Sequence, residues 1–180
     1  MPIDTARTVR GALAGATAAS VWALQQPLDK RVFESSYDDV ELLGKAVTRG
    51  SAWPIVGLVL HLQNGALFGA VYANVVSRAR ARVPGVACGA AAGLAEHVGL
   101  WPAGRLTDRF HPARRELPRL TGNRRAFWQA TWRHALFGVL LGELERRLNP
   151  ATPVSVQPAA PTAASSNGHG SLEHAALGTS

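Results

Sequence analysis

The chain has 180 residues, of which 47% are hydrophobic, and its formal net charge of +7 comes almost entirely from arginine. This length suits one domain. The single cysteine, Cys88, excludes an internal disulfide, and no Cys and His residues have the spacing of a zinc site. Cys88 lies among Gly and Ala and is expected to be a small packing residue. The apolar residues are concentrated in four stretches, which we take in chain order.

The first apolar stretch, Gly11 to Leu24, follows two arginines and predicts a helix over about 9–26. Secretory signal sequences also place a basic end before a short apolar region and a small-residue cleavage site. Here the small residues lie inside the stretch, and three further apolar stretches follow. We therefore expect the helix to be retained.

The second stretch, Trp53 to Val76, carries the strongest indication of the class of protein. It lies within 28 consecutive residues without a charge, between Arg49 and Arg78. A helix needs about 20 mostly apolar residues to cross a hydrocarbon core of ~30 Å, and buried helices of soluble domains are usually shorter. We predict a membrane-spanning helix over 53–76. The preceding segment, Ser36 to Gly50, predicts a short surface helix, because two aspartates precede its apolar pattern.

The third and fourth stretches predict helices over 83–101 and 126–145, and thus an all-α integral membrane four-helix bundle within residues 1–149. Residues 103–125 contain seven arginines and are expected to be mostly irregular. A basic loop near aromatic residues also fits nucleic acid, but membrane topology and anionic headgroups ordinarily select basic loops beside apolar spans. We predict contact with membrane lipids and none with nucleic acid. The Ala-, Pro- and Ser-rich tail, 150–180, is predicted to be disordered.

Glycine recurs at every fourth position of these stretches, the small-residue spacing by which membrane helices approach closely. The glycines predicted to pack helices are Gly11, Gly15, Gly65, Gly69, Gly85, Gly89, Gly93, Gly138 and Gly142. The second and fourth stretches also share the pattern His-x-x-x-Gly-x-x-x-Gly, which begins at His61 and at His134. This repetition predicts two helical hairpins repeated in parallel, related by a pseudo-twofold axis along the membrane normal.

Polar side chains inside the apolar stretches predict an intramembrane cluster, since a rise of 1.5 Å per residue places them at similar depth. The predicted cluster consists of His61, Gln63, Asn64, Glu96, His97, Arg133 and His134, with Gln25 and Gln26 at its edge. Glu96 and Arg133 are predicted to form an ion pair, because pairing removes most of the cost of placing each charge within a span. A proton or substrate site is the alternative reading.

Two histidines at equivalent repeat positions, His61 and His134, are also able to ligate a haem or a metal across a bundle. Interhelical hydrogen bonds explain them as well, and no further ligands have suitable spacing, so we predict no cofactor and no metal site. The sequence has no nucleophile elbow, no P-loop, no His-Glu-x-x-His and no Rossmann glycine pattern after a strand. We predict no enzymatic activity.

The segment Arg10-Gly-Ala-Leu-Ala-Gly15, the two His-x-x-x-Gly-x-x-x-Gly helices and the short Arg-flanked turns resemble small, uncharacterised four-span bacterial membrane proteins. The resemblance extends to about Asn149 and carries no catalytic residues. The predicted function is that of a structural or partner-binding module of the cell (inner) membrane, associated with itself or another membrane protein. The alternative function is a small proton-coupled or solute transporter that uses the polar cluster. A soluble helical bundle is the competing fold, because the first and third stretches are weakly apolar.

Overall fold

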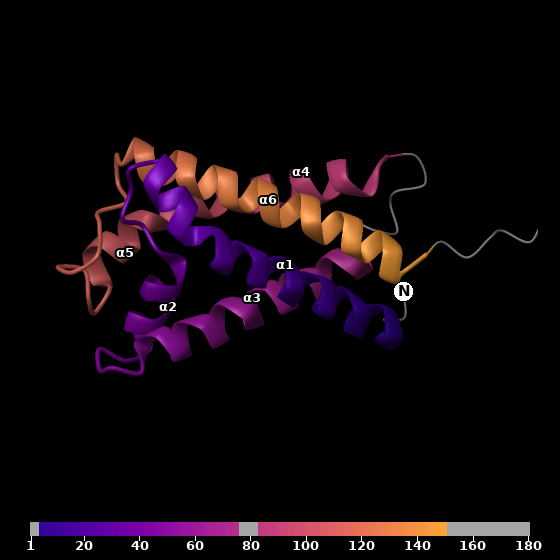
Figure 1. The fold of residues 1–180 in the computed structure, drawn as a ribbon, viewed down its shortest axis with the longest axis horizontal. Coiled ribbons are helices and arrows are strands. Elements are labelled where there is room, and N and C mark those ends of the chain that lie inside the picture. The colour runs from indigo at the N-terminus through magenta and orange to yellow at the C-terminus, as the bar shows by residue number, and fades with distance from the viewer. Residues whose placement is uncertain (1–3, 76–82, 151–180) are drawn as a thin grey trace, which may run out of the picture.

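A computed structural model describes residues 4–75 and 83–150, in which the chain forms helices and loops and no strand. The predicted all-α class is therefore confirmed. The elements are α1 (Thr5–Val32), α2 (Asp39–Val47), α3 (Trp53–Val75), α4 (Gly85–Leu100), the short 3-10 helix η2 (Trp101–Ala103), α5 (Gly104–Phe110) and α6 (Arg124–Leu148) (Figure 1). The predicted tail lies outside the described residues except for its first residue.

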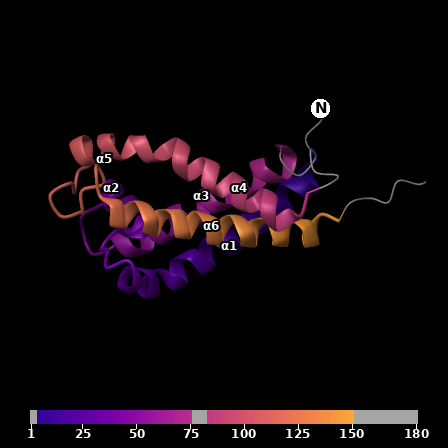
Figure 2. The same cartoon turned by 90° about the horizontal axis from the view of Figure 1, so that it is seen from above.

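The four long helices α1, α3, α4 and α6 lie along the long axis of the molecule (Figure 1). Helices α1 and α4 run toward the end that carries α2 and α5, and α3 and α6 run back. A second view, turned by 90°, again shows α2 and α5 together at the end opposite the N-terminus (Figure 2). The short elements thus cover one end of the bundle.

Helix α1 ends six residues beyond the expected boundary of 26, although it contains Pro27. A proline inside a helix removes one backbone hydrogen bond, and sequence patterns therefore favour a stop there. The additional turn carries Asp29, whose carboxylate is bound by Arg133 of α6 at 2.6 Å. This tertiary contact holds the turn in helical form.

Residues 103–125 are mostly irregular, as expected, since 111–123 form no helix, but Gly104–Phe110 forms the short helix α5, which the sequence did not predict. The Asp108 carboxylate accepts hydrogen bonds of 2.8 Å from the backbone N–H groups of Leu120 and Thr121. These bonds tie the rest of the loop to α5. Asn123 then caps α6 by accepting a hydrogen bond from the backbone N–H of Ala126 at 3.0 Å.

Glycine faces join the long helices in two pairs, α1 with α3 and α4 with α6. A Cβ atom added to Gly15 would lie 2.0 Å from the carbonyl oxygen of Gly65, and one added to Gly89 would lie 2.0 Å from that of Gly138. The other predicted packing glycines have similarly close backbone or Cβ neighbours. The two pairs correspond to the two halves of the predicted repeat.

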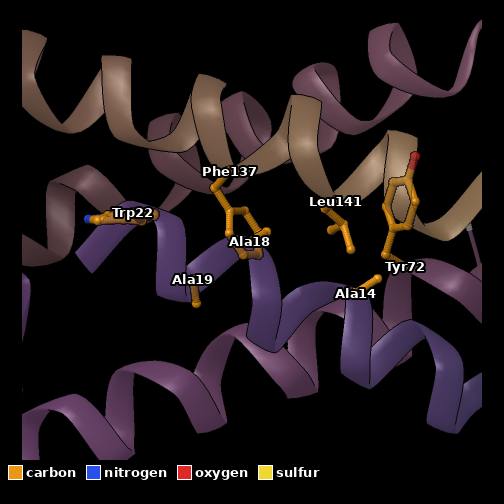
Figure 3. Close-up of a cluster of buried hydrophobic side chains, with 7 residues drawn as sticks. All are labelled: Ala14, Ala18, Ala19, Trp22, Tyr72, Phe137 and Leu141. Atoms are coloured by element: carbon orange, nitrogen blue, oxygen red, sulfur yellow. The ribbon is translucent and has the colours of Figure 1, made fainter. Parts of the chain in front are cut away.

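The two pairs meet through α1 and α6, whose contact contains the main apolar core. Phe137 and Leu141 of α6 point toward the alanines of α1 (Figure 3). The pseudo-twofold would relate this contact to one between α4 and α3, but α3 and α4 touch very little. The repeat is therefore broken at the contact between its halves.

Among the described helices, only α3 is long and apolar enough to cross a membrane by length and composition. The all-helical bundle is thus established by the structure, and the predicted four spans belong to the proposal below.

Candidate functional site

A cavity of about 290 Å³ lies inside the half of the bundle that α2, η2 and α5 cover. Helices α1 and α3 diverge toward this end (Figure 1). Its walls come from all four long helices, and its cover comes from α2, η2 and α5. Ordinary ligand cavities have volumes from ~300 Å³ upward, so this one suits a small ligand.

The cavity opens between α3 and α4. Its lining residues on α1, such as Ala19 and Trp22, are buried, whereas Asn64 on α3 and Leu100 on α4 remain exposed. This is the side on which the two halves of the repeat fail to pack. The missing contact therefore creates the entrance.

Three of the predicted cluster histidines line the cavity, and each has one ring nitrogen held by its own hydrogen bond. His61 donates from Nε2 to the carbonyl of Ala19 at 3.2 Å, and His134 donates from Nδ1 to the carbonyl of Ala130 at 2.8 Å. The Nε2 atom of His97 lies 2.9 Å from the hydroxyl of Thr131. The second ring nitrogen of each histidine has no hydrogen-bond partner among the described residues.

Aromatic rings complete the wall beside these histidines. Trp22 contacts the ring of His61 at a centroid distance of 5.1 Å and that of His134 at 4.7 Å. His97 contacts Trp101 at 5.4 Å and His134 at 4.9 Å. The imidazoles are thus fixed in edge-on and tilted ring contacts.

The predicted ion pair between Glu96 and Arg133 is wrong. Arg133 is fully buried and makes two hydrogen bonds of 2.6 Å to Asp29 and one of 2.7 Å to Asp39. Residues adjacent in a helix point about 100° apart, so His134 faces the cavity while Arg133 faces α1 and α2. We call Arg133, Asp29 and Asp39 the buried charge network.

The position of α2 brings Asp39 to this network. Asp38 caps α2 by accepting a hydrogen bond from the backbone N–H of Glu41 at 3.0 Å. Close contact between Gly57 of α3 and the carbonyl of Val40, where an added Cβ would lie 1.9 Å away, holds α2 against α3. Glycine at this contact thus positions a carboxylate that belongs to the network.

The Asp39 carboxylate also accepts a hydrogen bond of 2.6 Å from the Tyr37 hydroxyl. Burial acts to raise the pKa of Asp39, but attraction by Arg133 and the bond from Tyr37 outweigh it, so that this pKa lies below its ordinary value of 3.8. Burial and the neighbouring carboxylate raise the pKa of Tyr37 well above 10.0. Asp39 is therefore ionised and Tyr37 neutral at physiological pH.

Glu96 lines the cavity without a partner. It is half-buried on α4 and makes no hydrogen bond or ion pair with any described residue. Asp39 is the other acidic side chain that lines the cavity, and the lining contains no Lys or Arg from the described ranges.

The predicted cluster is only partly assembled. His61, Asn64, Glu96, His97 and His134 line the cavity, but Gln63 is exposed on the outer side of α3 and Arg133 lies behind the wall. Gln25 donates to Asp29 at 2.5 Å and accepts from the Trp132 indole at 3.2 Å, and Gln26 is buried nearby. Gln25 therefore borders the charge network, and neither glutamine lines the cavity.

Sequence reasoning missed Asp29, Asp39 and the aromatic residues of the wall. Both aspartates lie outside the apolar stretches, and only polar residues inside those stretches were expected at similar membrane depth. One usable signal was Gln129, one turn before Arg133, which donates to Asp29 at 2.7 Å. Gln129 and Arg133 are four residues apart and therefore lie on the same face of α6. Such a polar face inside a bundle requires polar partners from another helix.

No group of three or more His, Cys, Asp or Glu residues within 4–75 and 83–150 has the geometry to hold a metal ion. In comparisons with known proteins, no family model, no curated protein and no solved structure matches the chain.

Proposed function

We propose that this chain is a multi-pass protein of the cell (inner) membrane, in which two glycine-packed helix pairs hold a ligand-binding cavity. The observation that carries the proposal is an inverted distribution of side chains. Among the described residues, four of the six largest fully buried side chains are polar or charged, namely Arg133, Gln129, Glu145 and Asp29, and the other two are Tyr72 and Leu141. Large apolar side chains instead cover the outer faces of the long helices. Water-soluble domains normally bury apolar side chains and rarely expose large apolar patches.

Helix α3 supports this reading by itself. Its 23 residues extend about 35 Å at 1.5 Å per residue, more than a hydrocarbon core of ~30 Å. Only 28% of its most apolar window is buried, whereas the core helix of a soluble protein would be mostly buried. Ile55 and Val71 are 72% and 62% exposed. Lipid contact accounts for this exposure.

The other long helices fit the same setting through their pairing. Two ion pairs join α1 to α6: Asp29 with Arg133 in the interior, and Arg7 with Glu145 at 3.0 Å near the opposite end of the two helices. Intramembrane charges characteristically face the bundle interior and pair there. Helix α4, with 16 residues, is shorter than the bilayer core and requires local thinning of the bilayer.

Binding is the function that the interior supports. The glycine faces are occupied within the protein, by α3 against α1 and by α6 against α4, so they are not available to a second chain. A second copy or another membrane protein would instead contact the outer apolar faces. The cavity is the feature with directed polar groups.

Proton-coupled or solute transport is the second candidate. Glu96 and the unpartnered ring nitrogens of three histidines are groups that exchange protons, and they share one cavity. Uptake of a bound solute into proteoliposomes driven by a pH gradient, and its loss in Glu96→Gln, would favour transport over binding alone.

Alkaline carbonate extraction of membranes tests whether the chain is an integral membrane protein. An integral protein stays in the pellet, because its apolar faces remain in lipid. Release of the full chain into the supernatant would refute the membrane assignment and favour the soluble bundle.

A further inference from the structure

The charges around the cavity do not balance. The buried charge network sets one guanidinium, Arg133, against two carboxylates, Asp29 and Asp39, and therefore holds a formal charge of −1. The nearby Lys30 is paired with Asp38. Glu96 adds a carboxyl group with no partner among the described residues, and a cationic ligand beside it would favour its ionised form.

An excess of carboxyl groups favours a cationic ligand, and the other residues that line the cavity indicate which kind of cation. Trp22, Phe68 and Trp101 present aromatic rings to the cavity, and aromatic faces attract organic cations. A histidine that donates from one ring nitrogen accepts a hydrogen bond at the other in its neutral form, which suits a ligand with N–H donors. A carboxylate forms its strongest hydrogen bonds with a charged donor.

The size and entrance of the cavity restrict the ligand further. A volume of about 290 Å³ accommodates about ten non-hydrogen atoms, at the ~30 Å³ that one water-sized group occupies in a liquid. The entrance between α3 and α4 lies on the side that faces lipid in the proposed membrane setting. A ligand entering there has an apolar body.

We propose that the cavity binds a small protonated amine with an aromatic or other apolar body, its ammonium group at Glu96 and its apolar part among Trp22, Phe68 and Trp101. The inference rests on the proposed function, because it names the ligand class of the same cavity.

The test compares three probes of nearly equal size with the purified full-length protein in lipid nanodiscs at neutral pH. These are 2-phenylethylamine, which is a cation at this pH, neutral 2-phenylethanol and anionic phenylacetate. Ligand-observed NMR titration measures each dissociation constant into the millimolar range. We expect the amine to bind at least about tenfold more tightly than the alcohol, and the anion not to bind.

Two variants locate the charge that is responsible. Glu96→Gln is expected to remove the tenfold preference for the amine, whereas Glu34→Gln, which changes an exposed acid outside the cavity, is expected to retain it. Because Glu96 has no partner among the described residues, its replacement should leave the thermal unfolding midpoint unchanged. The preference measured in the unmodified protein does not depend on how either variant folds.

The outcomes separate the two proposals. Equal binding of amine and alcohol, or an undiminished preference in Glu96→Gln, would overturn the amine assignment and leave the ligand-binding function standing. Binding of none of the probes would overturn the amine assignment and count against a ligand-binding cavity, while the membrane assignment would still depend on the carbonate extraction.

Discussion

Removing Arg133 should destabilise the fold more than any other single arginine substitution in the described residues. Its guanidinium is fully buried and donates to Asp29 twice, to Asp39 once and to the carbonyl of Tyr37 at 3.2 Å. Arg133→Met leaves two carboxylates without a counter-charge, one of them with a side chain 1% exposed. Breaking a buried pair costs about 3–5 kcal/mol, and we expect a loss of unfolding free energy in this range.

An exposed ion pair provides the matched control. Arg125 lies 3.0 Å from Glu34, with side chains 65% and 70% exposed. Arg125→Met removes the same atoms from such a pair and should cost less than about 1 kcal/mol, because solvent screens the attraction. Circular dichroism during titration with a denaturing detergent in mixed micelles measures both variants. Similar losses for the two would refute the conclusion that the charge network stabilises the bundle.

Double-mutant cycles identify the partner of Arg133. Asp29→Asn combined with Arg133→Met should show a coupling of about 0.5–3 kcal/mol, as expected for residues in contact. Glu96→Gln combined with Arg133→Met should be additive within about 0.5 kcal/mol. The reverse result would restore the Glu96 pair predicted from the sequence.

The glycine contact and the buried tyrosine give two further expectations. Gly89→Ala should lower the unfolding free energy by about 1–3 kcal/mol in the same detergent titration, because the new Cβ would lie 2.0 Å from the Gly138 carbonyl oxygen. Gly99→Ala is the control, because there is open space at its Cβ, and it should not lower the unfolding free energy. Equal losses in the two variants would contradict close packing at Gly89. The raised pKa of Tyr37 means that its contribution to stability is complete below the unfolded-state pKa near 10.0 and is lost as the pH rises through the folded-state pKa. Tyr37→Phe should therefore flatten the alkaline fall of the unfolding midpoint, and an unchanged fall would show that Tyr37 is not its source.

The sequence alone was sufficient for the features that depend on local spacing. Glycines at every fourth residue lie on one helical face whatever the partner is, so close helix contact and the two-hairpin repeat were predictable. The 28 uncharged residues around α3 likewise predict a long apolar helix without reference to its neighbours. Histidines at equivalent repeat positions also indicated that the two halves share an interior.

The tertiary structure alone decided which polar groups meet. Arg133 and Glu96 have similar depth, but depth does not specify the direction in which a side chain points around its helix. Asp29 and Asp39 reach Arg133 because α1 continues past Pro27 and because α2 packs on α3, and both facts depend on contacts between distant segments. The cavity exists because α1 packs on α6 while α3 and α4 remain apart. A repeated sequence predicts that α3 packs on α4 as α1 packs on α6. Only the tertiary structure shows that the first of these two contacts is missing.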